Sequence, residues 1–497
     1  MPKQTIEADT TAEAYLALLA DRGVDYLFGN AGTDFASVIE ALSKAQLGES
    51  KAPTPVTVPH ENVAVAMAHG YYLATGRPQA VMLHVSVGTA NGVCGIVNAA
   101  RERIPMLFSA GRTPINEDGL PGSRSIYIHW AQEMFDQAGM VRELVKWDYE
   151  LRNLEQLETV VDRALTISMS EPRGPVYLTL PREVLAQKPG AFTYDSPTRR
   201  HPAKAGAPNA NVVDEAADLL AKAKNPLIIT SSYGQHPDDV AALADLAERF
   251  AIPVVCYRPR YVCLPTGHPM HVGFEPGGRI GSADVILTLE SDTPWIPSLH
   301  KLNPDAKVIQ AGVDPLFANY PIRGFPSDLT IAADPGATVR AIADAMEGKA
   351  KNASARMDAT RKAVAEQRAE VAENQAATIK RQSTGGPMEY PWVAHCIGQV
   401  MNDDDALVSE SQLPVGFLGS RKAGTIFGTS PAGGLGWGNG AALGLQLADS
   451  KRRVFILHTP HDGATKTWIS QGRTAEWCVL IADLVVSGAS RGPHAFF

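Results

Sequence analysis

Short apolar runs alternate with helix-like patterns along most of the chain, and this alternation constrains the fold more than any other feature of the sequence. Apolar runs lie at residues 26–28, 80–85 and 106–110, and helical patterns follow at positions such as 34–44 and 62–75. Alternation of this kind is typical of β–α–β units, in which parallel strands form a sheet covered by helices. The sequence therefore predicts an α/β fold made of doubly wound parallel sheets.

Polar connectors divide the 497 residues into three blocks. We expect a first domain at 1–187, a central α/β domain at 188–346, a helical linker at 347–387 and a last domain at 388–497. Residues 188–207 are rich in Pro, Lys and Arg and are expected to be a further linker. The last block is short for an α/β domain, so the third domain is predicted to be incomplete, either truncated or diverged.

Composition excludes several functions. The net charge is -8 and no basic block occurs, which argues against a nucleic-acid partner. The apolar stretches are shorter than the roughly 18 residues that a membrane helix needs, and the N-terminus lacks the pattern of a secretory signal. Five scattered cysteines without a Cys-x-x-Cys pair indicate reduced thiols in a cytoplasmic protein.

Polar loops follow the predicted strands of the first block, where ligands bind in open parallel sheets. Glu61 begins a helix of small apolar residues, against which a carboxylic acid can retain its proton; as a first-turn residue it would also stabilise the helix dipole. His84 ends a buried strand and on its own is better interpreted as a core histidine. Thr33 is a candidate helix N-cap.

The third block contains a dense run of glycines at 433–444, which lets backbone approach a ligand closely and begins a helix. After the next strand, Asp462 and Gly463 could hold a hard cation on a diphosphate, or could form a hairpin turn. Nucleotide-binding interpretations of residues 88–95 and 232–234 are weak, because neither matches a phosphate-loop spacing.

Taken in order, six short sequence motifs, here called phrases, resemble those of the thiamine-diphosphate superfamily of acetolactate synthases and benzoylformate decarboxylases. The resemblance covers residues 10 to about 455. The phrases lie at 28–33, 59–62 with 68–71, 88–92, 174–178, 265–269 and 433–437. The resemblance implies pyrimidine-binding, central and diphosphate-binding domains. It also implies thiamine diphosphate and Mg²⁺ as cofactors, and decarboxylation or carboligation of a 2-oxo acid.

The resemblance assigns roles to individual residues. Glu61 is matched to the carboxyl group that meets N1′ of the aminopyrimidine, and Leu435 to the bulky residue that bends the cofactor. His84 and Thr33 look more like benzoylformate decarboxylase than acetolactate synthase, and His84 is then a proton relay. The remaining cofactor contacts fall on Gly433 and Gly434 at the pyrimidine, and on Ser411, Gln412, Asp462 and Gly463 at the diphosphate, with Asp462 as metal ligand.

The chain departs from the family near its end. The family has Gly-Asp-Gly followed by an Asn, and both the Asp and the Asn bind magnesium; here Asp462 follows a histidine, and no Asn occurs after Asn439. Residues 465–497 do not resemble the family. An alternative is therefore a non-catalytic homologue that keeps the fold without an intact Mg-diphosphate site.

The resemblance also implies assembly. In this family the cofactor lies between two subunits, so a single chain is expected to leave Glu61 far from Gly433. The chain is therefore predicted to form a homodimer or homotetramer.

Overall fold

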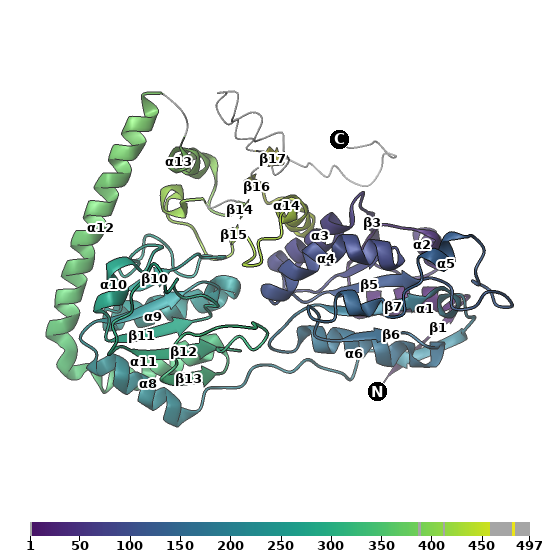
Figure 1. Ribbon diagram of the computed structural model, residues 1–497, viewed down its shortest axis with the longest axis horizontal. Coiled ribbons are helices and arrows are strands. Elements are labelled where there is room, and N and C mark those ends of the chain that lie inside the picture. Colours follow the sequence, from purple (N-terminus) through teal and green to yellow (C-terminus); the bar gives the residue numbers. More distant parts are fainter. Residues whose placement is uncertain (1, 386–388, 411–412, 458–479, 483–497) are drawn as a thin grey trace.

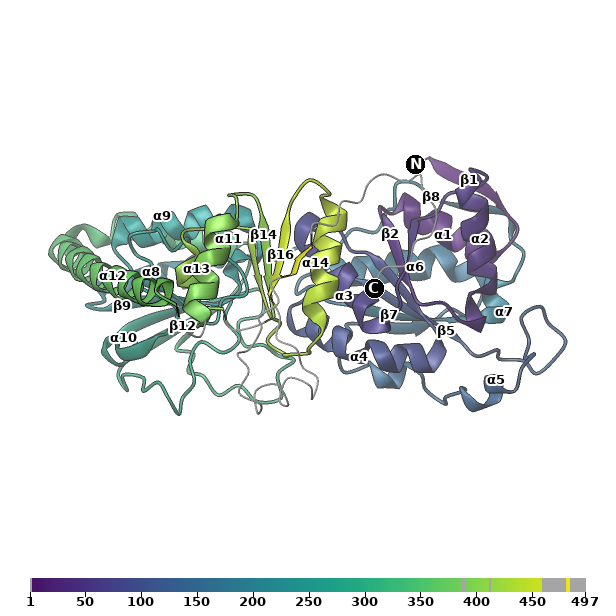
Figure 2. The same cartoon turned by 90° about the horizontal axis from the view of Figure 1, so that it is seen from above.

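Three parallel sheets form the framework of the protein, as the alternating sequence pattern predicts (Figure 1). The computed structural model describes residues 2–385, 389–410, 413–457 and 480–482. In two perpendicular views, the first sheet and the central sheet lie at opposite ends of an elongated molecule, and the smaller third sheet lies between them (Figures 1 and 2).

The first domain contains a six-stranded parallel sheet in the order β3-β2-β4-β5-β7-β6. Its strands are β2 (Tyr26–Gly29), β3 (Thr54–Thr57), β4 (Ala80–Leu83), β5 (Leu107–Arg112), β6 (Asp148–Glu150) and β7 (Val176–Pro181). Its helices are α1 (Thr11–Asp21), α2 (Ala36–Gln46), α3 (Glu61–Thr75), α4 (Val85–Arg101), α5 (Ile128–Ala131), α6 (Leu157–Met169) and α7 (Arg182–Leu185). Gly76 ends α3 in the left-handed conformation.

One predicted linker is partly wrong. Residues 190–195 form strand β8 (Gly190–Asp195), which pairs antiparallel with β1 (Lys3–Ala8) at the edge of the first domain. The pair buries Phe192 and Tyr194 against the core of the first domain. Pro, Lys and Arg flank this short strand and hide its alternating pattern, in which Phe192 and Tyr194 point inward and their neighbours outward.

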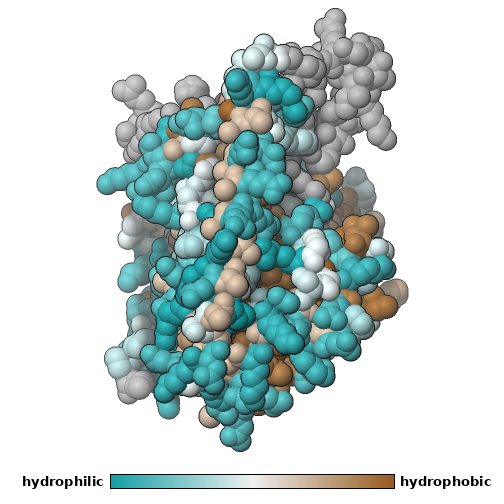
Figure 3. All heavy atoms as spheres, turned by 90° about the vertical axis from the view of Figure 1, so that its left-hand side faces the viewer, coloured by the Kyte–Doolittle hydropathy of each residue, from teal (hydrophilic) through white to brown (hydrophobic). Residues whose placement is uncertain are grey.

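The central domain holds a five-stranded parallel sheet in the order β10-β9-β11-β12-β13. Its elements are α8 (Ala210–Lys222), β9 (Pro226–Thr230), α9 (Val240–Phe250), β10 (Val254–Cys256), α10 (Gly277–Ser282), β11 (Val285–Leu289), β12 (Lys307–Gly312), β13 (Leu329–Ala332) and α11 (Pro335–Glu347). The 30-residue helix α12 (Ser354–Ser383) follows and presents a largely hydrophilic face to solvent (Figure 3). Val364 is its one fully buried side chain.

The third domain is small. Strands β14 (Ala406–Ser409), β15 (Ile426–Gly428) and β16 (Val454–Leu457) are parallel, whereas β17 (Leu480–Ala482) pairs antiparallel with β16. Helices α13 (Tyr390–Val400) and α14 (Trp437–Ala448) accompany this sheet. The predictions for the metal aspartate and for residues 465–497 fall almost entirely outside the described residues; only 480–482 are described, as strand β17.

Helix α14 packs against α3 of the same chain, and small residues allow a close approach. A Cβ atom placed on Gly70 would lie 2.0 Å from the Ala441 carbonyl oxygen, and one on Gly444 would lie 2.1 Å from the Met67 carbonyl oxygen. Only residues without a side chain fit such distances. This helix pair joins the beginning of α3, where Glu61 lies, to the glycine-rich turn before α14.

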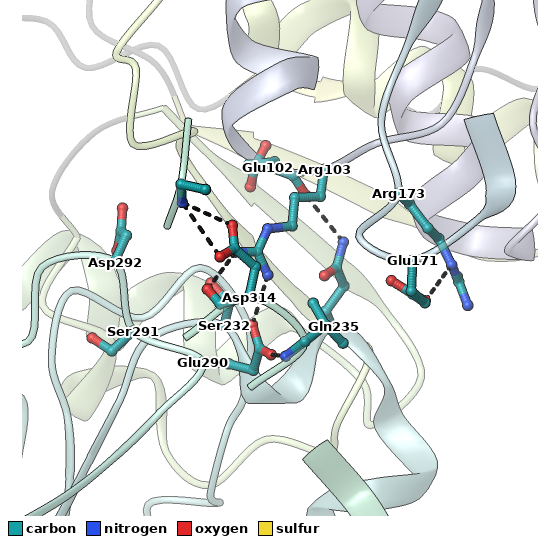
Figure 4. Close-up of polar contacts among 12 residues, drawn as sticks. Glu102, Arg103, Glu171, Arg173, Ser232, Gln235, Glu290, Ser291, Asp292 and Asp314 are labelled. Carbon is teal, nitrogen blue, oxygen red and sulfur yellow. Dashed lines mark hydrogen bonds and ion pairs between the residues drawn. The ribbon is translucent and has the colours of Figure 1, made fainter. Parts of the chain in front are cut away.

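Ion pairs join the first and central domains (Figure 4). Arg103 donates to the Glu290 carboxylate at 3.2 Å and to the Asp314 carbonyl oxygen at 3.2 Å, and its guanidinium lies over the Phe317 ring. Arg103, Glu290 and Phe317 all adopt positive φ angles, which are rare outside glycine. Gln235 donates to the Glu102 carbonyl oxygen at 3.2 Å across the same boundary.

A close backbone contact explains why a glycine occurs at position 234, in the segment that weakly resembles a nucleotide-binding loop. A Cβ atom on Gly234 would lie 2.3 Å from the Val262 carbonyl oxygen. Arg260, itself 7% exposed, donates to Ser232 and lies 3.3 Å from Asp292 at the carboxyl ends of β9 and β11. Protein side chains thus fill this part of the sheet edge.

Candidate active site

The carboxyl edge of the first sheet brings three polar segments together. A 3-10 turn, η1 (Thr33–Phe35), follows β2, His84 follows β4, and Gly111 lies near the end of β5. A Cβ atom on Gly32 would lie 2.1 Å from the His84 Nδ1 atom, and one on Gly111 would lie 1.9 Å from an Asp34 carboxylate oxygen. Both glycines therefore make room for an aspartate–histidine pair.

Asp34 and His84 form this pair. The Asp34 Oδ1 and His84 Nδ1 atoms are 2.6 Å apart, and Asp34 is 2% exposed. Because an ionised carboxylate can only accept a hydrogen bond, Nδ1 carries the proton of His84. The Nε2 atom of a neutral His84 is then free to accept, and the Gln132 amide nitrogen lies 3.4 Å from it.

The backbone after His84 is held in an unusual conformation. Val85, the first residue of α4, has a φ angle of 35°, an outlier for a β-branched residue. Its N–H group donates to the second Asp34 carboxylate oxygen at 3.3 Å. Strain of this kind collects at functional sites, where surrounding contacts maintain it. Asp34 therefore fixes both the ring and the backbone at this position.

A second histidine, His129, reaches the same place from the short helix α5. Its Nε2 atom is 3.3 Å from the Thr33 hydroxyl, and its Nδ1 atom accepts from the Ser125 N–H group at 3.2 Å. The ring is 1% exposed. Burial, with nearby Arg182 and Arg124, lowers the pKa of His129.

Ion pairs anchor the loop that carries His129 and Gln132. The Glu133 carboxylate accepts from Arg112 at 2.8 Å, from Arg124 at 2.5 Å and from the Thr113 hydroxyl at 2.8 Å. This segment follows β5 and includes the short helix α5, which carries His129, at the edge of the first domain (Figure 2). Such a network of charged hydrogen bonds holds a long irregular segment in one position.

Glu61 is the first residue of α3. The His60 side chain caps this helix by accepting from the Asn62 N–H group at 3.1 Å. The Glu61 side chain is half-buried, and within the described part of the chain no hydrogen bond or ion pair engages its carboxylate. A helix N-terminus with an unpaired carboxyl group can receive a ligand that offers both a proton acceptor and a proton donor.

The glycine-rich turn lies beside this helix. Asn98 of α4 holds Gly434 by two hydrogen bonds, from the Gly434 N–H group at 3.0 Å and to its carbonyl oxygen at 2.7 Å. Gly433 and Gly436 have positive φ angles of 63° and 85°. Leu435 is 45% exposed at the tip of the turn.

One expectation about the turn is wrong. A Cβ atom on Gly436 would be 3.5 Å from the Asn62 amide nitrogen, so the turn lies next to the beginning of α3 in the same chain. A single chain therefore does not leave Glu61 far from Gly433. The small residues of α3 and α14 bring the two segments together, as described above. Assembly into a dimer or tetramer stays a prediction.

The diphosphate end of the expected site lies outside the described residues. Ser411, Gln412, Asp462 and Gly463 all fall there. Glu410, the neighbour of Ser411, is described: it is buried and accepts from the Trp437 N–H group at 2.8 Å, which joins β14 to the beginning of α14. Among the described residues, no cluster of three or more His, Cys, Asp or Glu side chains could hold a metal ion.

Sequence reasoning missed Asp34, His129 and Gln132. Asp34 was interpreted only as the beginning of a helix, and the loop after β5 offered no periodic pattern. The sequence shows only that Asp34 follows the candidate site residue Thr33; the burial of Asp34 is a tertiary feature.

Comparison with known proteins gives a consistent result. The model of the N-terminal TPP binding domain of thiamine pyrophosphate enzymes matches residues 9–140, and the model of their central domain matches residues 213–342. Benzoylformate decarboxylase of Pseudomonas aeruginosa is 26% identical over 88% of this chain and 79% of its own length. The acetolactate synthase large subunit of Buchnera aphidicola is 26% identical, over 63% of this chain and 55% of its own length.

Solved structures agree on the fold. The 4-hydroxybenzoylformate decarboxylase of Rhodococcus jostii superposes with a TM-score of 0.69 at 21% identity, over 90% of this chain and 80% of that one. A structure from Mycobacterium smegmatis gives a TM-score of 0.70. The chain belongs to the superfamily of thiamine-diphosphate-dependent enzymes. Within the described residues, no helix is both long and apolar enough to cross a membrane.

Proposed function

We propose that the protein is a thiamine-diphosphate-dependent decarboxylase of a 2-oxo acid, similar in its reaction to benzoylformate decarboxylase. The observation that carries this proposal is the pair of buried Asp34 and partly exposed His84 beside Thr33, at the carboxyl edge of the pyrimidine-binding domain. Release of an aldehyde requires that the carbon that loses carbon dioxide receive a proton. A histidine with a fixed tautomer is suited to that proton transfer.

The described residues fit the pyrimidine half of the cofactor. The half-buried Glu61 carboxylate is available to N1′, and the turn at Gly433 and Gly434 presents backbone groups beside it. Leu435 projects from that turn, where a bulky side chain would bend the cofactor. When bound, thiamine diphosphate supplies a carbanion and an electron sink.

Each residue of the proposed site then has a defined role. Glu61 holds a proton at N1′. Asp34 accepts the Nδ1–H of His84 and stabilises the imidazolium that forms when Nε2 takes up a proton. His84 thereby carries a proton to or from the reacting carbon, and the Thr33 hydroxyl binds the substrate.

We propose that Asp462 contributes to a Mg²⁺ site with Ser411, Gln412 and Gly463 at the diphosphate. The protein would work as a homodimer or homotetramer in the cytoplasm. Carboligation of the acetolactate synthase type is the second candidate reaction, favoured by the match to acetolactate synthase subunits.

The organic product distinguishes the two reactions, because decarboxylation and carboligation of a 2-oxo acid both release carbon dioxide. With thiamine diphosphate and Mg²⁺, we expect the protein to convert phenylglyoxylate to carbon dioxide and benzaldehyde. Pyruvate should release carbon dioxide more slowly and yield little acetolactate. The measurement is a coupled assay of carbon dioxide with chromatography of the products. Acetolactate as the main product would make the enzyme a carboligase, and no turnover of either acid would refute the proposal.

A further inference from the structure

The two histidines of the site have opposite hydrogen-bonding polarity. His84 donates through Nδ1 to Asp34 and leaves Nε2 as an acceptor, at 16% side-chain exposure. His129 accepts at Nδ1 from a backbone N–H group of Ser125 at 3.2 Å. A neutral imidazole has one donor and one acceptor nitrogen, so the Nε2 atom of His129 carries a proton.

That proton points at Thr33. The His129 Nε2 atom and the Thr33 hydroxyl oxygen are 3.3 Å apart, so Thr33 accepts from His129. A hydroxyl group has a single proton to donate. Once its oxygen accepts from His129, that proton is directed to another acceptor. Thr33 is exposed at the sheet edge, next to the His84 pair, so a bound ligand can supply that acceptor.

The surroundings keep His129 neutral. Burial lowers its pKa, the positive charges of Arg182 and Arg124 act in the same direction, and Asp34 acts in the opposite one. A charged His129 would need a second acceptor at Nδ1, where a backbone N–H group already points. The Glu133 ion pairs to Arg112 and Arg124 hold the loop in place. The hydrogen bond at Nδ1 thus leaves Nε2 as the donor of the neutral ring.

We propose that His129 is a positioning residue: through its Nε2–H it directs the Thr33 hydroxyl toward the carboxylate of the bound 2-oxo acid. This inference rests on the proposed function, because it names a 2-oxo acid as the ligand. The proposal gives the two histidines different roles. His84 exchanges a proton with the reacting carbon, whereas His129 exchanges none and acts through Thr33.

Substrate kinetics test this proposal. His129→Ala and Thr33→Val should each raise KM for phenylglyoxylate about 10-fold or more, with a smaller effect on kcat, because a hydrogen bond to a charged group is lost from substrate and transition state alike. In the double variant the two effects should not add, because His129 acts only through Thr33. His129→Gln keeps an N–H donor and should recover part of the loss. His201→Ala, an exposed histidine, is the matched control.

Additive effects in the double variant, or a loss confined to kcat, would overturn the proposal.

A second measurement does not depend on activity. Nitrogen-15 spectra of histidine-labelled protein, assigned by comparison with His129→Gln, should show His129 as the Nε2–H tautomer from pH 6 to pH 8, roughly the range in which an unperturbed imidazole titrates. A protonated or Nδ1–H ring would overturn the proposal even in an active enzyme. A wild-type protein with the expected tautomer and no turnover would instead refute the proposed function, and with it the 2-oxo acid as the ligand.

Discussion

Replacement of Glu61 by Gln is expected to lower kcat for 2-oxo-acid decarboxylation by about 100-fold or more, the usual scale for loss of a general acid–base group. The amide keeps the shape of the side chain but cannot give or take the proton at N1′. The carboxylate has no partner among the described residues, so the change should leave the fold intact. The measurement is a steady-state rate with saturating cofactor, together with a thermal melt.

Glu40→Gln is the matched control for this change. Glu40 is exposed on α2, and its replacement by Gln changes the net charge by the same amount as Glu61→Gln does. It should leave kcat unaltered. A Glu61→Gln enzyme that retained the wild-type rate would show that this carboxylate takes no part in the chemistry, and the assignment of α3 to the cofactor would fail with it.

Replacement of Asp34 by Asn should have the second largest effect, a fall in kcat of about 100-fold or more. An amide can present its N–H₂ group to His84 Nδ1 and so favour the opposite tautomer, in which Nε2 carries the proton. The imidazolium would also lose the carboxylate that stabilises it. Because Asp34 is 2% exposed, the near-isosteric Asn is preferable to Ala, which would leave a cavity.

A companion variant checks this explanation: Asp34→Glu keeps the negative charge beside His84 but lengthens the side chain. An Asn variant with an unchanged rate would show that His84 works without Asp34.

The fold was predictable because its signal is local. Buried parallel strands such as Ala80–Leu83 are continuous apolar runs, and helices such as α3 end at a glycine that adopts a positive φ angle. Strand β8 was not predictable in this way. Its pattern spans only six residues, and its partner β1 lies at the other end of the domain.

The site was predictable only in part. Glu61, His84 and Thr33 stand in recognisable phrases, and the structure brings His84 and Thr33 to one edge of the first sheet. Asp34 and His129 become site residues only through tertiary contacts. The short distance between Asp34 and His84 depends on Gly32 and Gly111, which leave room for these two side chains. Spacing along the chain carries no sign of either contact.

The position of the glycine-rich turn shows a similar limit. The resemblance predicts that Gly433 lies far from Glu61 in a single chain. The small residues of α3 and α14 instead let these two helices pack together within one chain. Gly70, Gly440 and Gly444 all lie at this contact. Small residues at helical spacing are a signal of close helix packing, but the sequence does not say which helix is the partner.

The most direct test of the account is a calorimetric titration of the full chain with thiamine diphosphate at saturating Mg²⁺. The account predicts binding with a micromolar Kd, and weaker binding without Mg²⁺ because the diphosphate then lacks its counter-charge. The Glu61→Gln variant should still bind, since the diphosphate supplies most of the affinity. A titration that produced no heat of binding up to millimolar cofactor would contradict the account, and would identify the protein as a non-catalytic member of its superfamily.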